Sequence, residues 1–170
     1  MTIHNFGLFW QRDEIEWTPG KGVPDRFMLL GRVGINLPKR RVADFRYQQG
    51  IYILYNSYTS VYVGLAGHNR LGARLREHTC DPLKAKWSRF SWFGFSPVEE
   101  GTDQKILKLV QPKDDISFDT QSTIRDTEAL LQRVLNASEN TQKTAFQHGC
   151  EWDQVLWHEI KNYTGINVGA

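Results

Sequence analysis

The sequence predicts an α+β domain with a small central antiparallel sheet of about three strands, flanked by helices and preceded by a partly β N-terminal extension. Three observations support this fold class. Two β-branched and aromatic runs, at 50–55 and 61–64, enclose a polar segment, which is typical of a hairpin. A third apolar run follows at 90–95. Apolar residues then recur at helical spacing over 123–135.

The composition is that of an ordinary globular protein. The chain has 170 residues, of which 40% are hydrophobic and 24% charged, and a formal net charge of +2. Such a chain can bury a core, which excludes a fully disordered protein. Two cysteines are too few for a disulfide framework. No apolar run approaches the roughly 18 residues of a membrane-spanning helix, and no signal peptide is visible, so we expect a cytoplasmic protein without membrane contact.

We expect one domain with extensions, because no linker rich in Gly, Ser or Pro divides the chain. Residues 1–49 are interpreted as an N-terminal extension of short strands and turns packed on the core. Residues 50–145 form the core itself. Residues 146–170 are expected to contribute a C-terminal helix, roughly 152–163, that packs its aromatic side chains on the core. A further short strand is expected at 106–110.

The predicted hairpin brings two tyrosines together. If the polar segment 56–60 closes symmetrically about Ser57, Tyr52 lies directly opposite Tyr62. Residues paired in this way leave the same face of a sheet, with their Cβ atoms about 5 Å apart. We therefore expect two phenol groups to project side by side.

A short helix is expected directly after the hairpin, at residues 71–78. Leu71, Leu75 and His78 fall within a narrow arc at helical spacing. Arg74 lies one turn before His78, beside that arc. The helix should therefore present an arginine and a histidine next to its buried face.

The later helix, at 123–135, carries a carboxylate at the margin of its apolar stripe. Ser122 is a plausible N-cap, and Glu128 falls at the edge of the stripe. A carboxylate in such a place needs a cation or hydrogen bonds, unless its side chain reaches water. Both environments stay open for Glu128. The apolar positions of the stripe are Ile124, Leu130, Leu131, Val134 and Leu135.

Positive charge concentrates in residues 68–90, where basic and aromatic side chains alternate. This bias fits the docking of a polyanion, but charge alone favours a solvated helix face. The loop residues Lys39, Arg40 and Arg41 allow the same two interpretations, a phosphate clamp or an exposed turn. The basic residues of the first segment are Arg70, Arg74, Arg76, Lys84, Lys86 and Arg89.

The order of these features resembles the GIY-YIG nuclease family. The matching motifs are Gly50-Ile51-Tyr52, Tyr62-Val63-Gly64 as a mild variant of the second motif, Leu71-x-x-Arg74-Leu75-x-x-His78 and Thr127-Glu128-Ala129-Leu130-Leu131. The resemblance spans about residues 50–140. It implies a three-stranded sheet flanked by helices, and a metal-dependent endonuclease that hydrolyses phosphodiester bonds of nucleic acid, with DNA favoured over RNA.

Carried over position by position, the resemblance implies a set of catalytic residues that includes the metal ligand. Glu128 would hold the ion, Mg²⁺ or Mn²⁺, and Arg74 would be the helix arginine of the family. The two motif tyrosines and the helix histidine complete the set. The implied catalytic residues are Tyr52, Tyr62, Arg74, His78 and Glu128.

The implied substrate-binding positions match the family less closely. Members often carry a basic residue soon after the second motif, and here His68 or Arg70 takes that place. The late asparagine of the family corresponds to Asn140 or to Asn136, and Asn140 is preferred. It lacks the usual preceding proline.

These residue types suit phosphodiester hydrolysis. The reaction needs positioned water, positive charge at the phosphoryl oxygens and stabilisation of the leaving oxygen. Arg74 offers charge-assisted hydrogen bonds to phosphate, and one carboxylate together with waters can hold Mg²⁺. Tyr52 is the candidate for activating water, a task that Tyr62 or His78 can share.

Two further functions stay open. The first is a nucleic-acid-binding module that keeps the scaffold and does not cut. The second is a structural adaptor recognised through its aromatic ends. The sequence leaves the recognition site and the oligomeric state undecided, so a homodimer that cuts both strands is also consistent with it.

Overall fold

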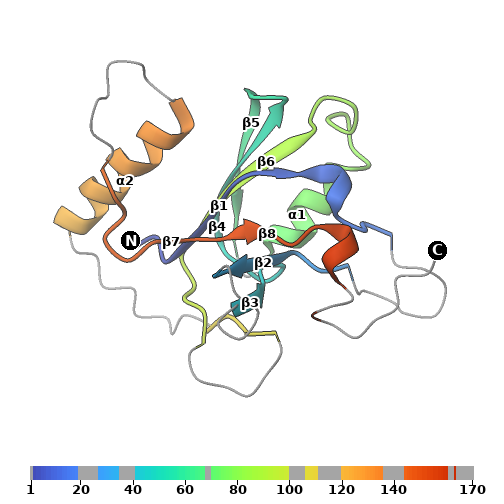
Figure 1. Cartoon of the computed structure of the whole chain (residues 1–170). Coiled ribbons are helices and arrows are strands. Elements are labelled where there is room, and N and C mark those ends of the chain that lie inside the picture. Colours follow the sequence, from blue (N-terminus) through green and yellow to red (C-terminus); the bar gives the residue numbers. More distant parts are fainter. Residues whose placement is uncertain are drawn as a thin grey trace.

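The computed structural model describes residues 2–18, 27–34, 41–67, 70–99, 106–110, 120–135, 144–160 and 163, with the backbone alone for 120–124. These residues form two β-sheets and two α-helices, α1 (Leu71–Glu77) and α2 (Thr120–Leu135), which confirms the α+β class (Figure 1). Five of the candidate residues lie outside the described part of the chain, namely Lys39, Arg40, His68, Asn136 and Asn140.

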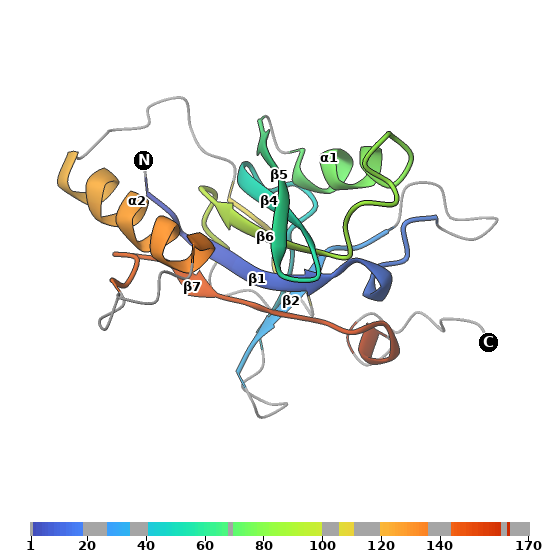
Figure 2. The same cartoon turned by 90° about the horizontal axis from the view of Figure 1, so that it is seen from above.

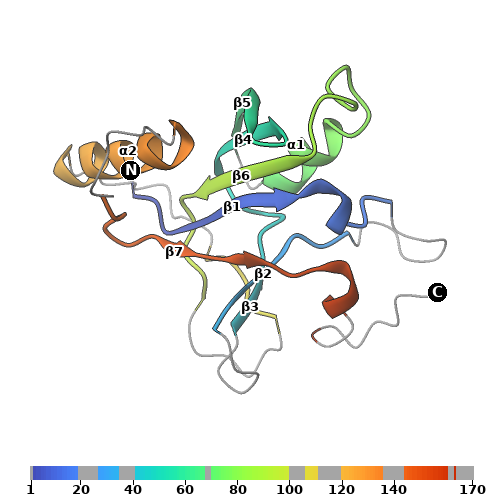
Figure 3. The same ribbon diagram turned by 45° about the horizontal axis from the view of Figure 1, so that its top comes forward.

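The central sheet has five strands, so the expectation of about three is wrong. Its order is β5 (Thr59–Ala66), β4 (Gly50–Asn56), β6 (Arg89–Gly94), β1 (Asn5–Gln11) and β7 (Cys150–Glu151). The first three of these are the strands that the sequence predicts. β1 pairs antiparallel with β6, and β7 pairs parallel with β1 (Figure 3).

Strand β1 belongs to the sheet because it buries side chains on both of its faces. An irregularity in its pairing with β6 includes Phe9, which has a φ of 52°. Phe6 and Trp10, on either side of it, pack into different hydrophobic cores. A strand with aromatic groups on two faces is stable only inside a sheet that is covered on both. A short 3₁₀ helix, Arg12–Glu14, follows it.

A second sheet has the order β3 (Arg41–Asp44), β2 (Leu30–Val33) and β8 (Asp153–Gln154), with antiparallel pairing throughout. The C-terminal region therefore starts with strands, and the expected helix does not begin at Trp152. The Trp152 indole N–H donates to Asn5 Oδ1 at 2.8 Å, which fixes this segment against the central sheet.

Two other segments also refine the expectation. A 3₁₀ helix, Trp157–Glu159, follows β8. Residues 106–110 form isolated bridges, Leu107 to Ala43 and Leu109 to Val98, in place of the expected strand.

The two α-helices cover opposite faces of the central sheet (Figure 2). Successive side chains of a strand point to opposite faces. On β4, Tyr52 and Leu54 pack in the core that contains residues of α1, whereas Ile53 and Tyr55 pack in the core that contains Ala129 of α2. The sheet thus separates the two helices that carry candidate residues. Neither described helix is long and apolar enough to cross a membrane.

Helix α2 confirms the predicted later helix, although its buried face differs. It starts at Thr120, so Ser122 lies inside the helix and does not cap it. Ala129 is fully buried, whereas Leu131 and Leu135 are 47% and 68% exposed. The helix is therefore rotated about its axis relative to the predicted stripe.

The buried carboxylate of α2 is Asp126. Its Oδ2 accepts a hydrogen bond from the Ile3 N–H at 2.8 Å, and its Oδ1 accepts one from the Gln147 N–H at 3.1 Å. These bonds join the N-terminal segment and the segment after α2 to the helix. Glu128 is exposed, and its Oε1 accepts a hydrogen bond from Gln132 Nε2 at 3.1 Å. Of the two environments open for Glu128, the water-facing one is observed.

Candidate active site

The hairpin closes more tightly than the sequence suggests. Asn56 pairs with Thr59, so the turn consists of Ser57 and Tyr58 alone. Ser57 has a φ of 56°, and a positive φ in a two-residue turn matches the twist of the strands. Three residues of the loop that the sequence predicts therefore belong to the strands, namely Asn56 in β4 and Thr59 and Ser60 in β5.

A bulge changes which residues of the hairpin lie opposite one another. Leu54 pairs with Tyr62, and Tyr52 pairs with Gly64, so the predicted direct pairing of the two tyrosines is wrong. Tyr52 and Tyr62 still share one face of the sheet, as diagonal neighbours. Their ring centroids are 6.1 Å apart. The expectation of two adjacent phenols is confirmed.

Two motif glycines make room for this arrangement. Gly50 has a φ of 154°, and a Cβ there would overlap the Phe93 carbonyl oxygen. A Cβ on Gly64 would overlap the Cζ and Oη atoms of Tyr52, because the phenol lies across this glycine. The second motif therefore needs glycine at position 64, because any side chain there would overlap the Tyr52 ring.

The two tyrosines lie against His78, the C-cap residue that directly follows α1. We call Tyr52, Tyr62 and His78 the tyrosine cluster. The Tyr52 Oη lies 2.8 Å from His78 Nε2, and the Tyr62 and His78 ring centroids are 4.9 Å apart. On its other side, His78 Nδ1 lies 2.6 Å from Asp81 Oδ2. The result is a hydrogen-bonded chain from phenol to imidazole to carboxylate.

The chemistry of the three groups sets the direction of this chain. An ionised carboxylate only accepts hydrogen bonds. His78 Nδ1 therefore carries a proton and donates a hydrogen bond to Asp81. In a neutral imidazole the Nε2 atom then accepts, and the Tyr52 hydroxyl donates to it. Asp81 is itself held in place, because its Oδ1 accepts the Leu83 N–H at 2.7 Å. Desolvation favours a higher pKa for Asp81, but hydrogen bonds from His78 and Leu83 outweigh it and lower that pKa.

Burial, and after it the neighbouring Tyr62, raise the pKa of Tyr52 to about 12, although the positive charge of Arg74 acts in the opposite direction. Tyr52 is fully buried. Its hydroxyl is therefore protonated throughout the neutral range and acts as a donor toward His78. An un-ionised phenol can move a proton only if a neighbour accepts one, and His78 provides that acceptor.

The raised pKa predicts a loss of stability at alkaline pH. The protonated phenol stabilises the fold fully below the unfolded pKa of about 10, and this contribution is lost as the pH rises through about 12. We expect the free energy of unfolding of the wild type to fall by about 1 kcal/mol more than that of Tyr52→Phe between pH 8 and pH 11. Denaturant titrations at both pH values measure this difference, and equal losses in the two proteins would contradict the assignment.

Arg74 lies between the tyrosine cluster and an acidic neighbour. Its Nη1 donates to Glu77 Oε2 at 2.6 Å, and Arg70 Nη2 donates to Glu77 Oε1 at 2.8 Å. Charge interaction with Tyr52 raises the pKa of Arg74, so its guanidinium stays positive. The side chains of Arg70 and Arg74 are 57% and 37% exposed. Both arginines can therefore meet a phosphate that approaches the cluster from solvent.

Of the seven described candidate residues, the structure brings four together, links Arg70 to them through the Glu77 that it shares with Arg74, and leaves two apart. Tyr52, Tyr62, Arg74 and His78 lie on the α1 side of the central sheet. Arg41 is on β3 in the second sheet, with its Cζ 6.0 Å from the Trp152 ring. Glu128 is on α2, which packs on the other face of the central sheet.

The resemblance implies Mg²⁺ or Mn²⁺ held by Glu128, but α2, which carries Glu128, packs on the face of the central sheet opposite Tyr52. Within the described residues, no group of three His, Cys, Asp or Glu side chains is placed to hold a metal ion. The carboxylates nearest the tyrosine cluster are those of Glu77 and Asp81, and both already accept hydrogen bonds. Metal dependence therefore stays a prediction from the sequence.

One functional residue, Asp81, has no role in the sequence interpretation. It follows the helix by four residues, in a segment read only as basic. The spacing His78-x-x-Asp81 could have indicated this contact. The chain continues in helical turns after α1, which brings positions i and i+3 together. Trp87 closes this segment by donating its indole N–H to the His78 carbonyl at 3.1 Å.

Comparisons with known protein families, with curated proteins and with solved structures find no match for this chain. The functional assignment therefore rests on the residues of the tyrosine cluster and on their geometry.

Proposed function

We propose that this protein is an endonuclease of the GIY-YIG type that hydrolyses phosphodiester bonds of nucleic acid, with DNA as the favoured substrate. The observation that carries the proposal is the hydrogen-bonded chain Tyr52–His78–Asp81, with Tyr62 and Arg74 beside it. Four side chains that the motif order selects over 27 positions of sequence meet at one place. A structural role for each residue alone does not account for that convergence.

The proposed chemistry starts from the weakness of Tyr52 as a base. With a pKa of about 12, only about one phenol in 10⁵ is ionised at pH 7. A relay removes this obstacle. Water gives a proton to the Tyr52 oxygen while Tyr52 gives its own proton to His78 Nε2, and Asp81 stabilises the resulting imidazolium. The phenol is neutral before and after the transfer.

Substrate reaches this relay through the side chains that cover it. Tyr52 is buried, whereas Tyr62 and Arg74 are partly exposed, so a phosphate first meets Arg74 and Tyr62. The Arg74 guanidinium offers charge-assisted hydrogen bonds to the phosphoryl oxygens. Tyr62 and Arg74 must part for water to contact Tyr52. The new P–O bond forms to that water, the P–O bond to the leaving oxygen breaks, and the leaving oxygen takes up a proton from solvent. His78 then releases its extra proton to solvent.

Metal dependence is part of the proposal and has its own test. A bound Mg²⁺ or Mn²⁺ would supply positive charge at the phosphoryl and leaving oxygens. The resemblance predicts that EDTA abolishes cleavage, that Mg²⁺ restores it, and that Glu128→Gln loses the restoration. The position of Glu128 on the face of the central sheet opposite the tyrosine cluster predicts instead that Glu128→Gln keeps it. Glu151→Gln, the same change at another exposed acid, is the matched control. Mg²⁺-stimulated cleavage by Glu128→Gln at the wild-type rate would remove Glu128 from the site.

Asp81 is proposed as a positioning residue that fixes the His78 tautomer. In Asp81→Asn, the amide oxygen accepts the hydrogen bond from the Leu83 N–H. The amide NH₂ then faces His78 Nδ1 and donates to it. That contact favours a proton on Nε2, where Tyr52 needs an acceptor. We expect cleavage to fall by about 10²-fold or more. Imidazole nitrogen chemical shifts report the tautomer, and a full-rate variant with an Nε2 proton would contradict the relay.

A non-cleaving nucleic-acid-binding module is the alternative from a different class. The intact chain of three hydrogen-bonded groups favours the nuclease, because binding alone needs no proton path. A gel in which protein and supercoiled plasmid are mixed separates the two functions. A nuclease produces open circles that persist after the protein is removed, whereas a binding module only retards the plasmid.

A further inference from the structure

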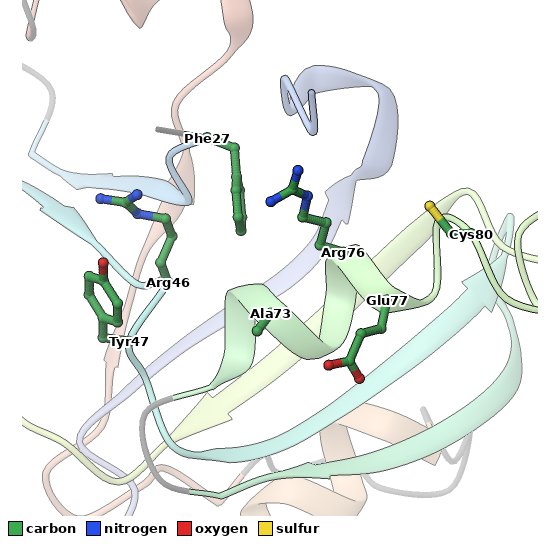
Figure 4. Close-up of a pocket in the computed structure, with 7 residues that line it drawn as sticks. All are labelled: Phe27, Arg46, Tyr47, Ala73, Arg76, Glu77 and Cys80. Atoms are coloured by element: carbon green, nitrogen blue, oxygen red, sulfur yellow. The ribbon is translucent and has the colours of Figure 1, made fainter. Parts of the chain in front are cut away.

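A second site lies on the solvent side of α1, next to the tyrosine cluster. Ala73, Arg76, Glu77 and Cys80 recur at helical spacing and form one wall of a pocket of about 510 Å³. The opposite wall comes from the segments that precede β2 and β4. We call this site the arginine pocket; it is lined by Phe27, Arg46, Tyr47, Ala73, Arg76, Glu77 and Cys80 (Figure 4).

The walls of the arginine pocket are fixed to each other through the backbone. The Gly72 N–H donates to the Arg46 carbonyl at 2.9 Å, and the Leu71 N–H donates to the Gln48 carbonyl at 3.0 Å. A Cβ on Gly72 would lie 3.0 Å from both the Arg46 Cα and the Phe27 ring, so α1 packs closely on this segment. The pocket is therefore formed before any ligand binds.

Its floor and rim combine cationic and aromatic groups. Phe27 lies between two guanidinium groups, with Arg46 Cζ 5.9 Å and Arg76 Cζ 5.6 Å from its ring centroid (Figure 4). Arg46 is also held by Asp44, to which its Nε donates at 2.7 Å. Tyr47 stands at the rim, 56% exposed, with Arg46 Cζ 5.2 Å from its ring.

Charge connects the pocket to the tyrosine cluster. Around α1, the positive side chains of Arg70, Arg74 and Arg76 outnumber the negative one of Glu77. Glu77 accepts hydrogen bonds from Arg70 and Arg74, so its charge is compensated where it faces the pocket. Arg74 lies toward the cluster and Arg76 toward the pocket. The net positive charge of these four side chains favours a polyanion that lies across α1.

The chemistry of this lining fits a nucleotide. An exposed aromatic ring next to arginines provides a stacking surface for a base, and every base can use it because every base has a π-face. The volume lies within the range of small-ligand pockets. A second hollow, of about 380 Å³, adjoins the pocket at Arg46 and Tyr47. Tyr47 therefore lies between the two hollows, with space for a flat group to stack on its ring.

We propose that the arginine pocket binds one unpaired nucleotide of a nucleic-acid chain whose neighbouring phosphate lies on the tyrosine cluster. The base stacks on Tyr47, and its phosphate pairs with Arg76. The inference rests on the proposed function and names its substrate class, nucleic acid with an unpaired nucleotide beside the scissile bond. A continuous duplex keeps its bases stacked within the helix and cannot fill the pocket.

The test measures binding without cleavage. Fluorescence anisotropy gives the dissociation constants of a labelled single-stranded oligonucleotide and of the blunt duplex of the same sequence, in the Tyr52→Phe background. We expect Tyr47→Ala to weaken single-strand binding about tenfold and duplex binding less than about twofold. Arg76→Ala should lower the slope of log Kd against log salt by about one.

A matched control separates the pocket from surface aromatics in general. Tyr58 is 68% exposed, and Arg89 Cζ lies 5.2 Å from its ring, as Arg46 Cζ does from Tyr47, but Tyr58 does not line the arginine pocket. Tyr58→Ala should leave both dissociation constants unchanged. Ala73→Leu, which fills the pocket and preserves helix propensity, should reproduce the single-strand loss of Tyr47→Ala.

Two outcomes overturn the inference. In the first, Tyr47→Ala and Ala73→Leu bind the single strand as tightly as Tyr58→Ala does. In the second, adenosine monophosphate at micromolar concentration displaces the oligonucleotide, which would identify a free nucleotide as the occupant. Because the measurement is of binding and not of cleavage, failure of the proposed function can be distinguished from failure of the pocket inference. If the protein does not cleave but its single-strand binding depends on Tyr47, the nuclease proposal is wrong and the pocket inference holds.

Discussion

Tyr52→Phe is expected to lower single-turnover cleavage of supercoiled DNA by about 10²- to 10⁴-fold while the protein stays folded. The variant removes the hydroxyl that lies 2.8 Å from His78 Nε2 and keeps the ring that packs against Gly64. Without that hydroxyl, no group passes the water proton to His78. The stability cost of the lost hydrogen bond is about 1 kcal/mol.

Tyr55→Phe is the matched control for this change. Tyr55 lies on the same strand, is equally buried, and points to the opposite face of the sheet, into the core that contains Ala129 of α2. Burial raises the pKa of Tyr55 as well, so a general effect of losing a buried phenol would appear in both variants. Equal rates for Tyr52→Phe and Tyr55→Phe would refute the relay.

Gly64→Ala is expected to cost both activity and stability. A Cβ at this position overlaps the Cζ and Oη atoms of Tyr52, and the buried ring has no solvent to move into. Forcing one methyl group into a packed site costs about 1–3 kcal/mol. The displaced Tyr52 hydroxyl also loses His78, so we expect cleavage to fall by about 10²-fold.

The control for Gly64→Ala is Gly67→Ala, because a Cβ at Gly67 has no atom within 4 Å. Denaturant midpoints and single-turnover rates of both variants separate the two effects. Restored activity in the double variant Gly64→Ala, Tyr52→Phe would contradict the proposal, since it would show that overlap with the hydroxyl is the only defect.

The hairpin and the first helix were predictable because they follow from local patterns. The runs around Tyr52 and Tyr62 are rich in β-branched and aromatic residues, as strands are, and the spacing of Leu71 and Leu75 is helical. The pairing of the tyrosines was not predictable to the residue. It depends on a bulge in β5 and on the positive φ of Ser57, and neither has a sequence signal as strong as Asn-Gly.

The size of the central sheet depends on contacts between distant segments. β1 and β7 join it through pairs such as Phe6 with Phe93 and Asn5 with Cys150. Hydrophobic periodicity within one segment carries no information on such partners. The same reason explains the error in the buried face of α2, where Asp126 turns inward to accept backbone N–H groups of Ile3 and Gln147.

The candidate site was predictable in part. The residue order selected Tyr52, Tyr62, Arg74 and His78, which the structure brings together. Asp81 was not selected, because its partner is determined by the turns that follow α1 and not by a motif. The arginine pocket depends equally on tertiary structure, since Phe27 and Arg76 come from segments about fifty positions apart.

The most direct test is conversion of supercoiled plasmid to open circles by purified wild-type protein and by Tyr52→Phe, prepared identically and assayed side by side with Mg²⁺. The proposal predicts open circles with the wild type, suppression by EDTA, and intact supercoiled plasmid with the variant. Intact plasmid in both samples, or open circles in both at the same rate, would contradict it.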